Sequence, residues 1–138
     1  GLPAIADDSG LEVDALHGRP GIFSARYAGE NADDAQNRRK LLEELAGVPW
    51  QERKARFVCA IAMTMPDGEE WTTLGSCEGI ILTEERGQHG FGYDPLFYFP
   101  PLQKTFAEMS EAEKNQVSHR GMAMRQLIRH LQALFGRV

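Results

Sequence analysis

Apolar and polar positions alternate in some segments of this chain and recur every three or four residues in others. Residues 55–65 and 71–82 alternate on either side of the turn sequence Pro66-Asp67-Gly68-Glu69, which predicts a β-hairpin. Trp71 would pack near the end of this hairpin, and the dense apolar run 96–99 predicts a further buried strand. The hairpin would give the core six apolar side chains, which are Phe57, Val58, Ile61, Met63, Ile80 and Ile81.

Helical spacing predicts a first helix that begins near residues 31–33 and ends at Gly47, before Pro49. Its apolar positions share one face, and they are Leu41, Leu42 and Leu45. The charge run 38–40 is interpreted as a solvated outer face.

The last third of the chain is predicted to be helical. Ser110 and Glu113 match a capping box, so a helix would begin at Glu111. A break near Ser118 would place the basic pair 119–120 in the first turn of a final helix, where free N–H groups favour an anion or a ring carbonyl. The buried stripe predicted for the end of the chain is Val117, Met124, Leu127, Ile128, Leu131, Leu134 and Phe135.

The polar stretch 6–10, with the sequence Ala-Asp-Asp-Ser-Gly, lies between an apolar lead-in and the alternating run 11–16. This pattern predicts a strand, a sharp polar turn and a second strand. Asp7 and Asp8 would then lie at a strand end, where paired carboxylates suit a hard cation such as Mg²⁺. A solvent-facing Asx turn is the alternative interpretation.

A second polar stretch, residues 87–95, carries glycines at 87, 90 and 92. These glycines would let the backbone approach a flat or charged group, although the spacing is not that of a dinucleotide-binding loop. The alternative is a tight loop that feeds a buried strand, which leaves Phe91 and Asp94 unexplained.

The composition bounds the class of protein. The 138 residues, 42% hydrophobic and 25% charged, predict one soluble globular domain, and a net charge of −5 argues against nonspecific nucleic-acid binding. No apolar run has membrane-spanning length, and we expect no signal peptide.

The two cysteines, Cys59 and Cys77, could pair across the hairpin, but buried free thiols in a reducing cytoplasm are favoured. The chain opens without Met, inside the predicted strand-turn-strand unit, which suggests a partial domain.

Five segments together resemble the inosine triphosphate pyrophosphatase family, whose members hydrolyse ITP, dITP and XTP to the monophosphate and pyrophosphate. They occur in the family's order and at family-like spacing, and they are residues 6–11, 20–27, 91–95, 113–114 and 118–121. The resemblance implies an α/β fold with a mixed, mostly antiparallel central sheet flanked by helices, spanning residues 1–138 as one partial domain. It also implies a Mg²⁺-dependent enzyme that is a cytoplasmic homodimer.

The resemblance also assigns roles by position. It implies that Asp8 binds the metal and accepts a proton, that Asp7 supports it as a metal carboxylate, and that Ser9 contacts the substrate. Residues matching the segment that stacks on the purine are Phe91, Gly92, Tyr93 and Asp94, and those matching the base-recognition cluster are Lys114, His119 and Arg120. Donors such as Arg120 suit the 6-oxo group of hypoxanthine or xanthine and mismatch the amino group of adenine.

The family's N-terminal strand, its Thr/Ser-x-Asn-x-x-Lys phosphate loop and its metal-binding Glu are not in this sequence. We therefore expect the 138 residues alone to be inactive. Two alternatives remain open: a purine-nucleotide-binding module without its own catalysis, and a phosphatase that uses the same acid pair on another metabolite.

Overall fold

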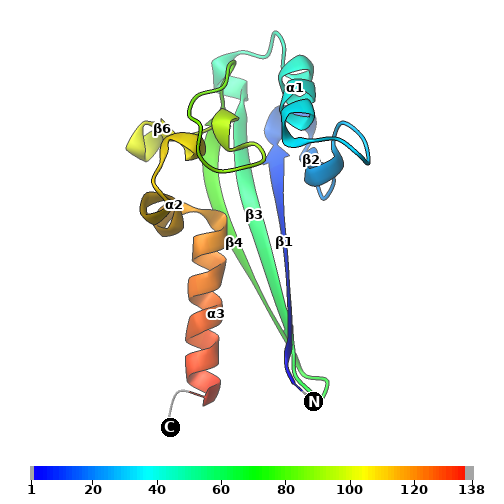
Figure 1. Ribbon diagram of the computed structural model, residues 1–138, viewed down its shortest axis with the longest axis vertical. Coiled ribbons are helices and arrows are strands. Elements are labelled where there is room, and N and C mark those ends of the chain that lie inside the picture. The colour runs from blue at the N-terminus through cyan, green and yellow to red at the C-terminus, as the bar shows by residue number, and fades with distance from the viewer. Residues whose placement is uncertain (1, 136–138) are drawn as a thin grey trace.

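The computed structural model describes residues 2–135 and consists of one sheet with helices around its upper end and along one face (Figure 1). The strand order is β2-β1-β3-β4-β5-β6, and every pairing among the described residues is antiparallel. The strands are β1 (Ala4–Val13), β2 (Pro20–Gly21), β3 (Lys54–Thr64), β4 (Glu70–Ile81), β5 (Phe97–Phe99) and β6 (Lys104–Thr105). The helices are α1 (Asp34–Glu44), α2 (Glu111–Val117) and α3 (His119–Phe135). The predicted α/β class is confirmed, as is the hairpin formed by β3 and β4.

Strand β1 corrects the prediction for residues 6–10. Its ten residues pair with β3 in one unbroken register, from Ala4 opposite Thr64 to Val13 opposite Ala55, so the polar stretch is part of a continuous strand and forms no turn. The reason is tertiary: β3 offers a partner to each of these residues, and a paired backbone satisfies the hydrogen bonds that a turn would otherwise provide.

Helix α1 begins at Asp34, directly after the predicted start near residues 31–33. The Asp33 side chain accepts a hydrogen bond from the Gln36 N–H, and the Gln36 side chain accepts one from the Asp33 N–H, which completes a capping box. The helix ends at Glu44, three residues before the predicted end.

The charge run 38–40 is not the solvated face that its composition suggests. Arg38 is only 16% exposed and donates to the Gly92 carbonyl, and Lys40 donates to the Tyr27 carbonyl. Arg39 is exposed, whereas the other two residues are partly buried. The interpretation was wrong because two loops from elsewhere in the chain lie against α1, which local sequence does not reveal.

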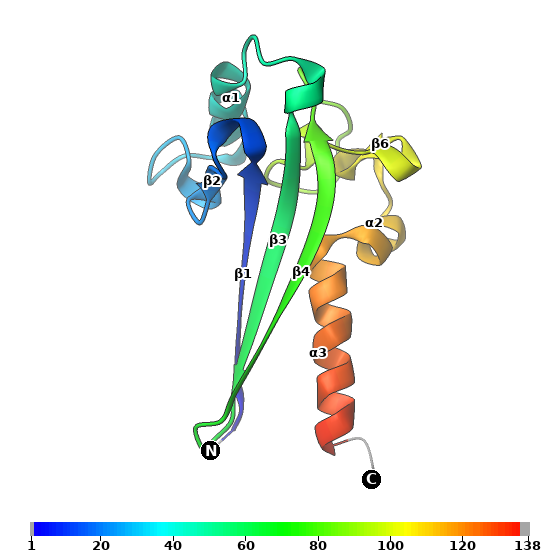
Figure 2. The same cartoon turned by 180° about the vertical axis from the view of Figure 1, so that it is seen from behind.

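Helix α3 runs alongside β3 and β4, as the views from both sides show (Figures 1 and 2). Ala123 and Leu127 pack against the sheet in a cluster that also contains Cys59, Ile61 and Met63. At the hairpin end, Trp71 stacks on His130 with ring centroids 4.2 Å apart, which confirms its packing role.

The predicted apolar stripe of α3 is only partly correct. Leu127 is buried, but the sheet covers only one side of the helix, so four of its apolar side chains are about half exposed: Met124, Ile128, Leu134 and Phe135. In the hairpin, likewise, Val58 and Ile80 are only partly buried because they point to the sheet face opposite α3.

Both cysteines are buried and free, as the favoured interpretation predicts. Cys59 lies opposite Gly75 and Cys77 lies opposite Phe57, so the two thiols are not cross-strand partners. Burial raises the pKa of the Cys77 thiol to about 12, which keeps it protonated. Among residues 2–135, no helix combines the length and apolarity that crossing a membrane requires.

Candidate functional site

The main cavity of the described residues has a volume of about 790 Å³ and lies where β1 and β3 meet the loop after β4, helix α2 and the first turn of α3. Its lining includes every residue assigned to the substrate from the sequence, which are Ser9, Phe91, Gly92, Tyr93, Asp94, Lys114, His119 and Arg120. The structure therefore brings these eight residues together from four separate segments. Their roles toward a substrate stay predictions.

One aromatic ring and two cations form the open side of the cavity. Phe91 is 61% exposed, and the Lys114 Nζ atom lies 4.6 Å from the centroid of its ring. The Arg120 guanidinium carbon lies 5.8 Å from the same centroid. Lys114 also forms an ion pair with the buried carboxylate of Asp94, which neutralises that carboxylate. A flat, polar group that slides onto Phe91 would meet donors at its edge.

His119 lies deeper, between aromatic side chains. Its ring stacks on Phe57 at 4.7 Å and is parallel to Phe106 at 6.4 Å. Burial, reinforced by the charges of Arg120 and Lys114, lowers the pKa of His119 to about 4, so the ring is neutral at pH 7.

Two buried polar atoms at the cavity have no hydrogen-bond partner. They are His119 Nδ1 and Ser9 Oγ. Buried polar atoms are normally paired, since an unpaired one loses its bond to water without compensation. Both atoms are therefore available to a polar group that enters the cavity.

The first turn of α3 is set by its cap and by two close backbone approaches. Ser118 Oγ accepts a hydrogen bond from the Gly121 N–H, so the helix begins at His119, as the predicted break requires. A Cβ on Gly121 would lie 1.9 Å from the Asn115 carbonyl oxygen, and one on Gly75 would lie 2.2 Å from the His119 carbonyl oxygen. Only glycine permits these contacts; the first places the start of α3 against α2, and the second seats His119 directly on β4.

The loop before β5 is organised by Asp94. Its Oδ2 atom accepts a hydrogen bond from the Phe91 N–H at 3.1 Å, and a Cβ on Gly90 would lie 2.2 Å from the same oxygen. Next to it, the Tyr93 hydroxyl donates to the Ser24 carbonyl, and burial raises the pKa of Tyr93 well above its usual value. Tyr93 and Asp94 thus stabilise the loop through contacts within the protein, whether or not they also contact a ligand.

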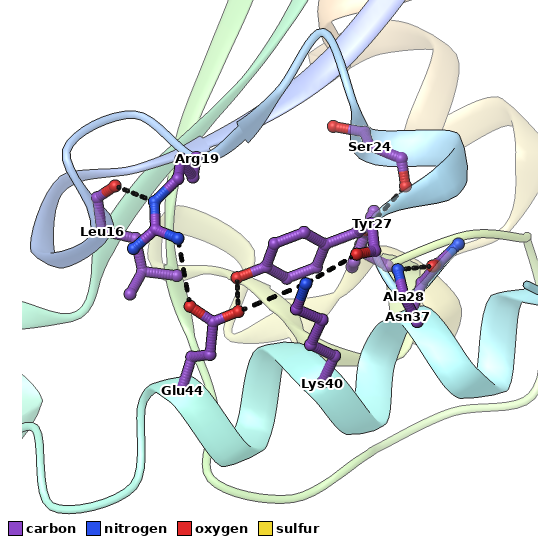
Figure 3. A network of polar contacts seen from close by, with 9 residues as sticks. Leu16, Arg19, Ser24, Tyr27, Ala28, Asn37, Lys40 and Glu44 are labelled. Atoms are coloured by element: carbon purple, nitrogen blue, oxygen red, sulfur yellow. Dashed lines mark hydrogen bonds and ion pairs between the residues drawn. The ribbon is translucent and has the colours of Figure 1, made fainter. Parts of the chain in front are cut away.

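A polar network behind the cavity fixes the segment 20–29 against α1 (Figure 3). The Tyr27 hydroxyl donates to Glu44 at 2.5 Å, and Arg19 and Lys40 lie 3.4 Å and 3.8 Å from the Glu44 carboxylate. The Asn37 side chain bridges the chain by accepting from the Ala28 N–H and donating to the carbonyl of residue 25. Burial and the bond to Glu44 raise the pKa of Tyr27, so it remains a donor.

The two aspartates lie outside the cavity lining. Because β1 is continuously paired, successive side chains alternate, so Asp7 faces α3 while Asp8 points to the opposite face. The Asp7 carboxylate lies 3.9 Å from Arg120. A single ion on one face of the sheet would reach only one of these carboxylates, so the geometry does not favour the predicted two-aspartate site.

The donor set fits Mg²⁺ only in part. Within residues 2–135 no three His, Cys, Asp or Glu side chains cluster in a way that could enclose a metal ion. Mg²⁺ is, however, commonly held by one or two carboxylates together with substrate phosphates and water, and the exposed Asp8 can provide one such ligand. The chain therefore fits a metal that arrives with a phosphorylated substrate.

Several cavity residues escaped the sequence reasoning. Asp34 and Asn37 on α1 line the cavity, and Phe57 and Phe106 form its floor. Phe57 was expected only as core, and no local signal distinguishes Asp34 from the other acids of the helix start. Their roles depend on contacts between distant segments.

The structure is thus an antiparallel α/β domain whose cavity brings together an exposed aromatic ring, two cations and a neutral histidine. The chain belongs to the Ham1 family, whose sequence profile matches residues 1–130, and this confirms the family resemblance. It is 61% identical over 127 residues to a dITP/XTP pyrophosphatase of Desulfotalea psychrophila, covering 92% of this chain and 56% of that protein. It is 57% identical over 125 residues to a dITP/XTP pyrophosphatase of Halalkalibacterium halodurans, covering 91% and 64%.

Solved structures agree with the fold. The Staphylococcus aureus Ham1 protein superposes with a TM-score of 0.91 at 49% identity, covering 96% of this chain and 68% of the other. A HAM1 protein from Coxiella burnetii gives a TM-score of 0.91 at 48% identity, with the same coverage of 96% and 68%. The chain thus spans a little more than half to two thirds of the length of its relatives.

Proposed function

We propose that this chain provides the base-recognition site of a Mg²⁺-dependent pyrophosphatase. That enzyme hydrolyses the non-standard purine triphosphates ITP, dITP and XTP to the monophosphate and pyrophosphate. One observation carries the proposal: the exposed Phe91 ring, the cations 114 and 120 and two unpartnered buried polar atoms converge on one cavity. The names of its relatives support the substrate class.

Base choice follows from the donors. A purine stacked on Phe91 would present its C6 edge to Arg120 and His119, and base–aromatic stacking contributes about 1–3 kcal/mol without reading that edge. A 6-oxo group accepts from these donors, whereas the amino group of adenine leaves them unpaired. Neutral His119 adds a donor or an acceptor without a second positive charge.

The phosphates would leave the cavity along β1. Strand β2 pairs only with Leu11 and Glu12, so the edge of β1 at Ser9 and Asp8 has no strand beside it among the described residues. A triphosphate could pass this edge from Ser9 to Asp8, which would accept a proton from the attacking water. Mg²⁺, when bound with the substrate, would neutralise charge on the phosphates.

The second candidate is a purine-nucleotide-binding module without catalysis. The placement of Asp7 and Asp8 on opposite faces of β1 favours this candidate. The two carboxylates cannot then hold one attacking water between them. Positioning and charge neutralisation supply most of the catalysis of phosphoryl transfer, so a chain lacking both would bind and not hydrolyse.

The test measures binding and turnover separately. Calorimetry should show inosine 5′-monophosphate binding to the 138-residue chain more tightly than adenosine 5′-monophosphate. With ITP and Mg²⁺, the chain alone should release no appreciable pyrophosphate, and addition of the N-terminal part of the D. psychrophila relative should produce release. Binding without turnover in both mixtures would support the binding module, and failure to bind either nucleotide would contradict both candidates.

We further expect a cytoplasmic homodimer. The half-exposed apolar side chains of α3 and the two free, buried thiols support this expectation. Sedimentation velocity across a range of concentrations tests the assembly; a monomer at every concentration would contradict it.

A further inference from the structure

Two side chains of helix α1 bind the backbone of one residue of the cavity loop, Gly92. The Gly92 N–H donates to Asp34 Oδ2 at 2.9 Å, and Arg38 Nη1 donates to the Gly92 carbonyl oxygen at 2.8 Å. Asp34 and Arg38 are four residues apart and therefore share one helix face. The N–H and the carbonyl of Gly92 are therefore both bound by side chains of α1, which lie 54 to 58 residues earlier in the sequence.

Arg38 also links the two ends of this loop. Its Nε atom lies 3.2 Å from Glu85 Oε1, at ion-pair distance but outside hydrogen-bond geometry, while its Nη1 atom holds Gly92. The loop after β4 reaches across the sheet toward α1 (Figure 1). Gly90 and Gly92 have φ values of 79° and 60°, a region that glycine adopts at little cost, so this loop conformation depends on its hydrogen bonds, those to Asp94 as well as those to α1.

The position of the Phe91 ring depends on these hydrogen bonds to the loop backbone. It is 61% exposed, so packing in the core does not hold it, and its neighbours Lys114 and Arg120 contact it only through their cationic ends. Its backbone, by contrast, directly precedes Gly92, whose N–H and carbonyl are both bound by α1. A stacking platform that is ordered before the ligand arrives avoids the entropy cost of ordering on binding.

We infer that Asp34 and Arg38 are positioning residues that fix the backbone of Gly92, at its N–H and its carbonyl, and so hold the Phe91 ring over the cavity. The ligand side of this inference rests on the proposed purine-binding function, whereas the effect on the loop does not. Neither side chain needs to touch the purine. Both act through Phe91.

The experiment compares neighbouring arginines on α1. Arg38→Ala removes the hydrogen bond to the Gly92 carbonyl. Arg39→Ala, which removes an exposed arginine, is the matched control. Inosine 5′-monophosphate is the probe. Calorimetry should give a dissociation constant about three- to tenfold weaker for Arg38→Ala, the range of one net hydrogen bond, and an unchanged constant for Arg39→Ala. Asp34→Ala is the second variant and should behave like Arg38→Ala.

A double-mutant cycle separates positioning from a general structural effect. In a Phe91→Ala background, Arg38→Ala should weaken binding no further, because the ring through which it acts is absent. Amide hydrogen exchange without ligand should show faster exchange at Gly92 in Arg38→Ala and Asp34→Ala. The inference is overturned if both variants keep the exchange rate and affinity of the wild type, or if the losses add in the Phe91→Ala background. If the wild type binds no nucleotide, the proposed function fails. The exchange measurement still decides whether Asp34 and Arg38 fix the backbone of Gly92.

Discussion

The Lys114 ammonium lies 4.6 Å from the centroid of the Phe91 ring, and the same ammonium is the ion-pair partner of Asp94. Asp94 is 5% exposed and Lys114 is 20% exposed, so the pair is largely shielded from water. One cation therefore both compensates a buried carboxylate and faces the exposed ring.

Lys114→Met should lower the free energy of unfolding by about 3 kcal/mol, because it leaves the Asp94 charge buried without its partner. Urea denaturation measures the change. Lys104→Met is the matched control: Lys104 and Glu113 are 40% and 36% exposed, and loss of such a pair should cost less than about 1 kcal/mol.

The combination of Lys114→Met with Asp94→Asn should recover part of the loss, since the uncompensated charge is then removed. Equal destabilisation by Lys114→Met and Lys104→Met would show that the Asp94 pair is not shielded as its burial indicates.

Arg120→Ala should weaken the binding of inosine 5′-monophosphate far more than that of adenosine 5′-monophosphate, because the lost donors serve the 6-oxo group. Phe91→Ala should weaken both nucleotides by about 1–3 kcal/mol, since stacking does not distinguish the C6 substituent. Competition calorimetry measures both constants. Arg129→Ala, an exposed arginine further along α3, is the control; an equal loss for both nucleotides in Arg120→Ala would indicate a phosphate contact instead.

The free energy of unfolding should fall as pH is lowered from 6.5 to 4. In this window the unfolded chain protonates His119 at the ordinary histidine pKa of 6.5, while the folded chain holds the pKa near 4. The unfolded state therefore binds more protons, so acid favours unfolding, by an amount on the order of 3 kcal/mol at the low end. Arg120 and Lys114 face the ring and act in the same direction.

Chemical denaturation across this pH range should show a flatter profile for His119→Gln than for the wild type. His17→Asn removes an exposed histidine in a left-handed conformation that asparagine tolerates, and it controls for overall charge. Identical profiles for the wild type and His119→Gln would contradict a buried, neutral His119.

Asp8→Asn should reduce pyrophosphate release by about 10²- to 10⁴-fold in the mixture that shows turnover, because the amide cannot accept a proton. Nucleotide binding should stay measurable. Asp7→Asn, on the opposite face of β1 beside Arg120, should affect binding more than turnover. Full turnover by Asp8→Asn would remove Asp8 from the mechanism.

Local sequence was sufficient for the elements whose ends are set by their own residues. The capping box 110–113 begins its helix at the predicted residue, α1 begins directly after the predicted residues 31–33, and the turn 66–69 closes the hairpin. These signals work because a cap or a turn satisfies backbone groups within four residues. The family motifs also singled out eight residues that line one cavity, although they lie in four separate segments, and their roles toward a substrate stay predictions.

Only the tertiary structure decided which face each side chain occupies. Asp7 and Asp8 read as a polar turn, yet strand β3 pairs every residue of β1 and so sends them to opposite faces. Arg38 and Arg39 read as one charge run, yet the distant Gly92 carbonyl binds one and leaves the other in solvent. The sequence shows which residues are able to form a hydrogen bond or an ion pair. It does not show the partner, because the partner belongs to a distant segment that only folding brings close.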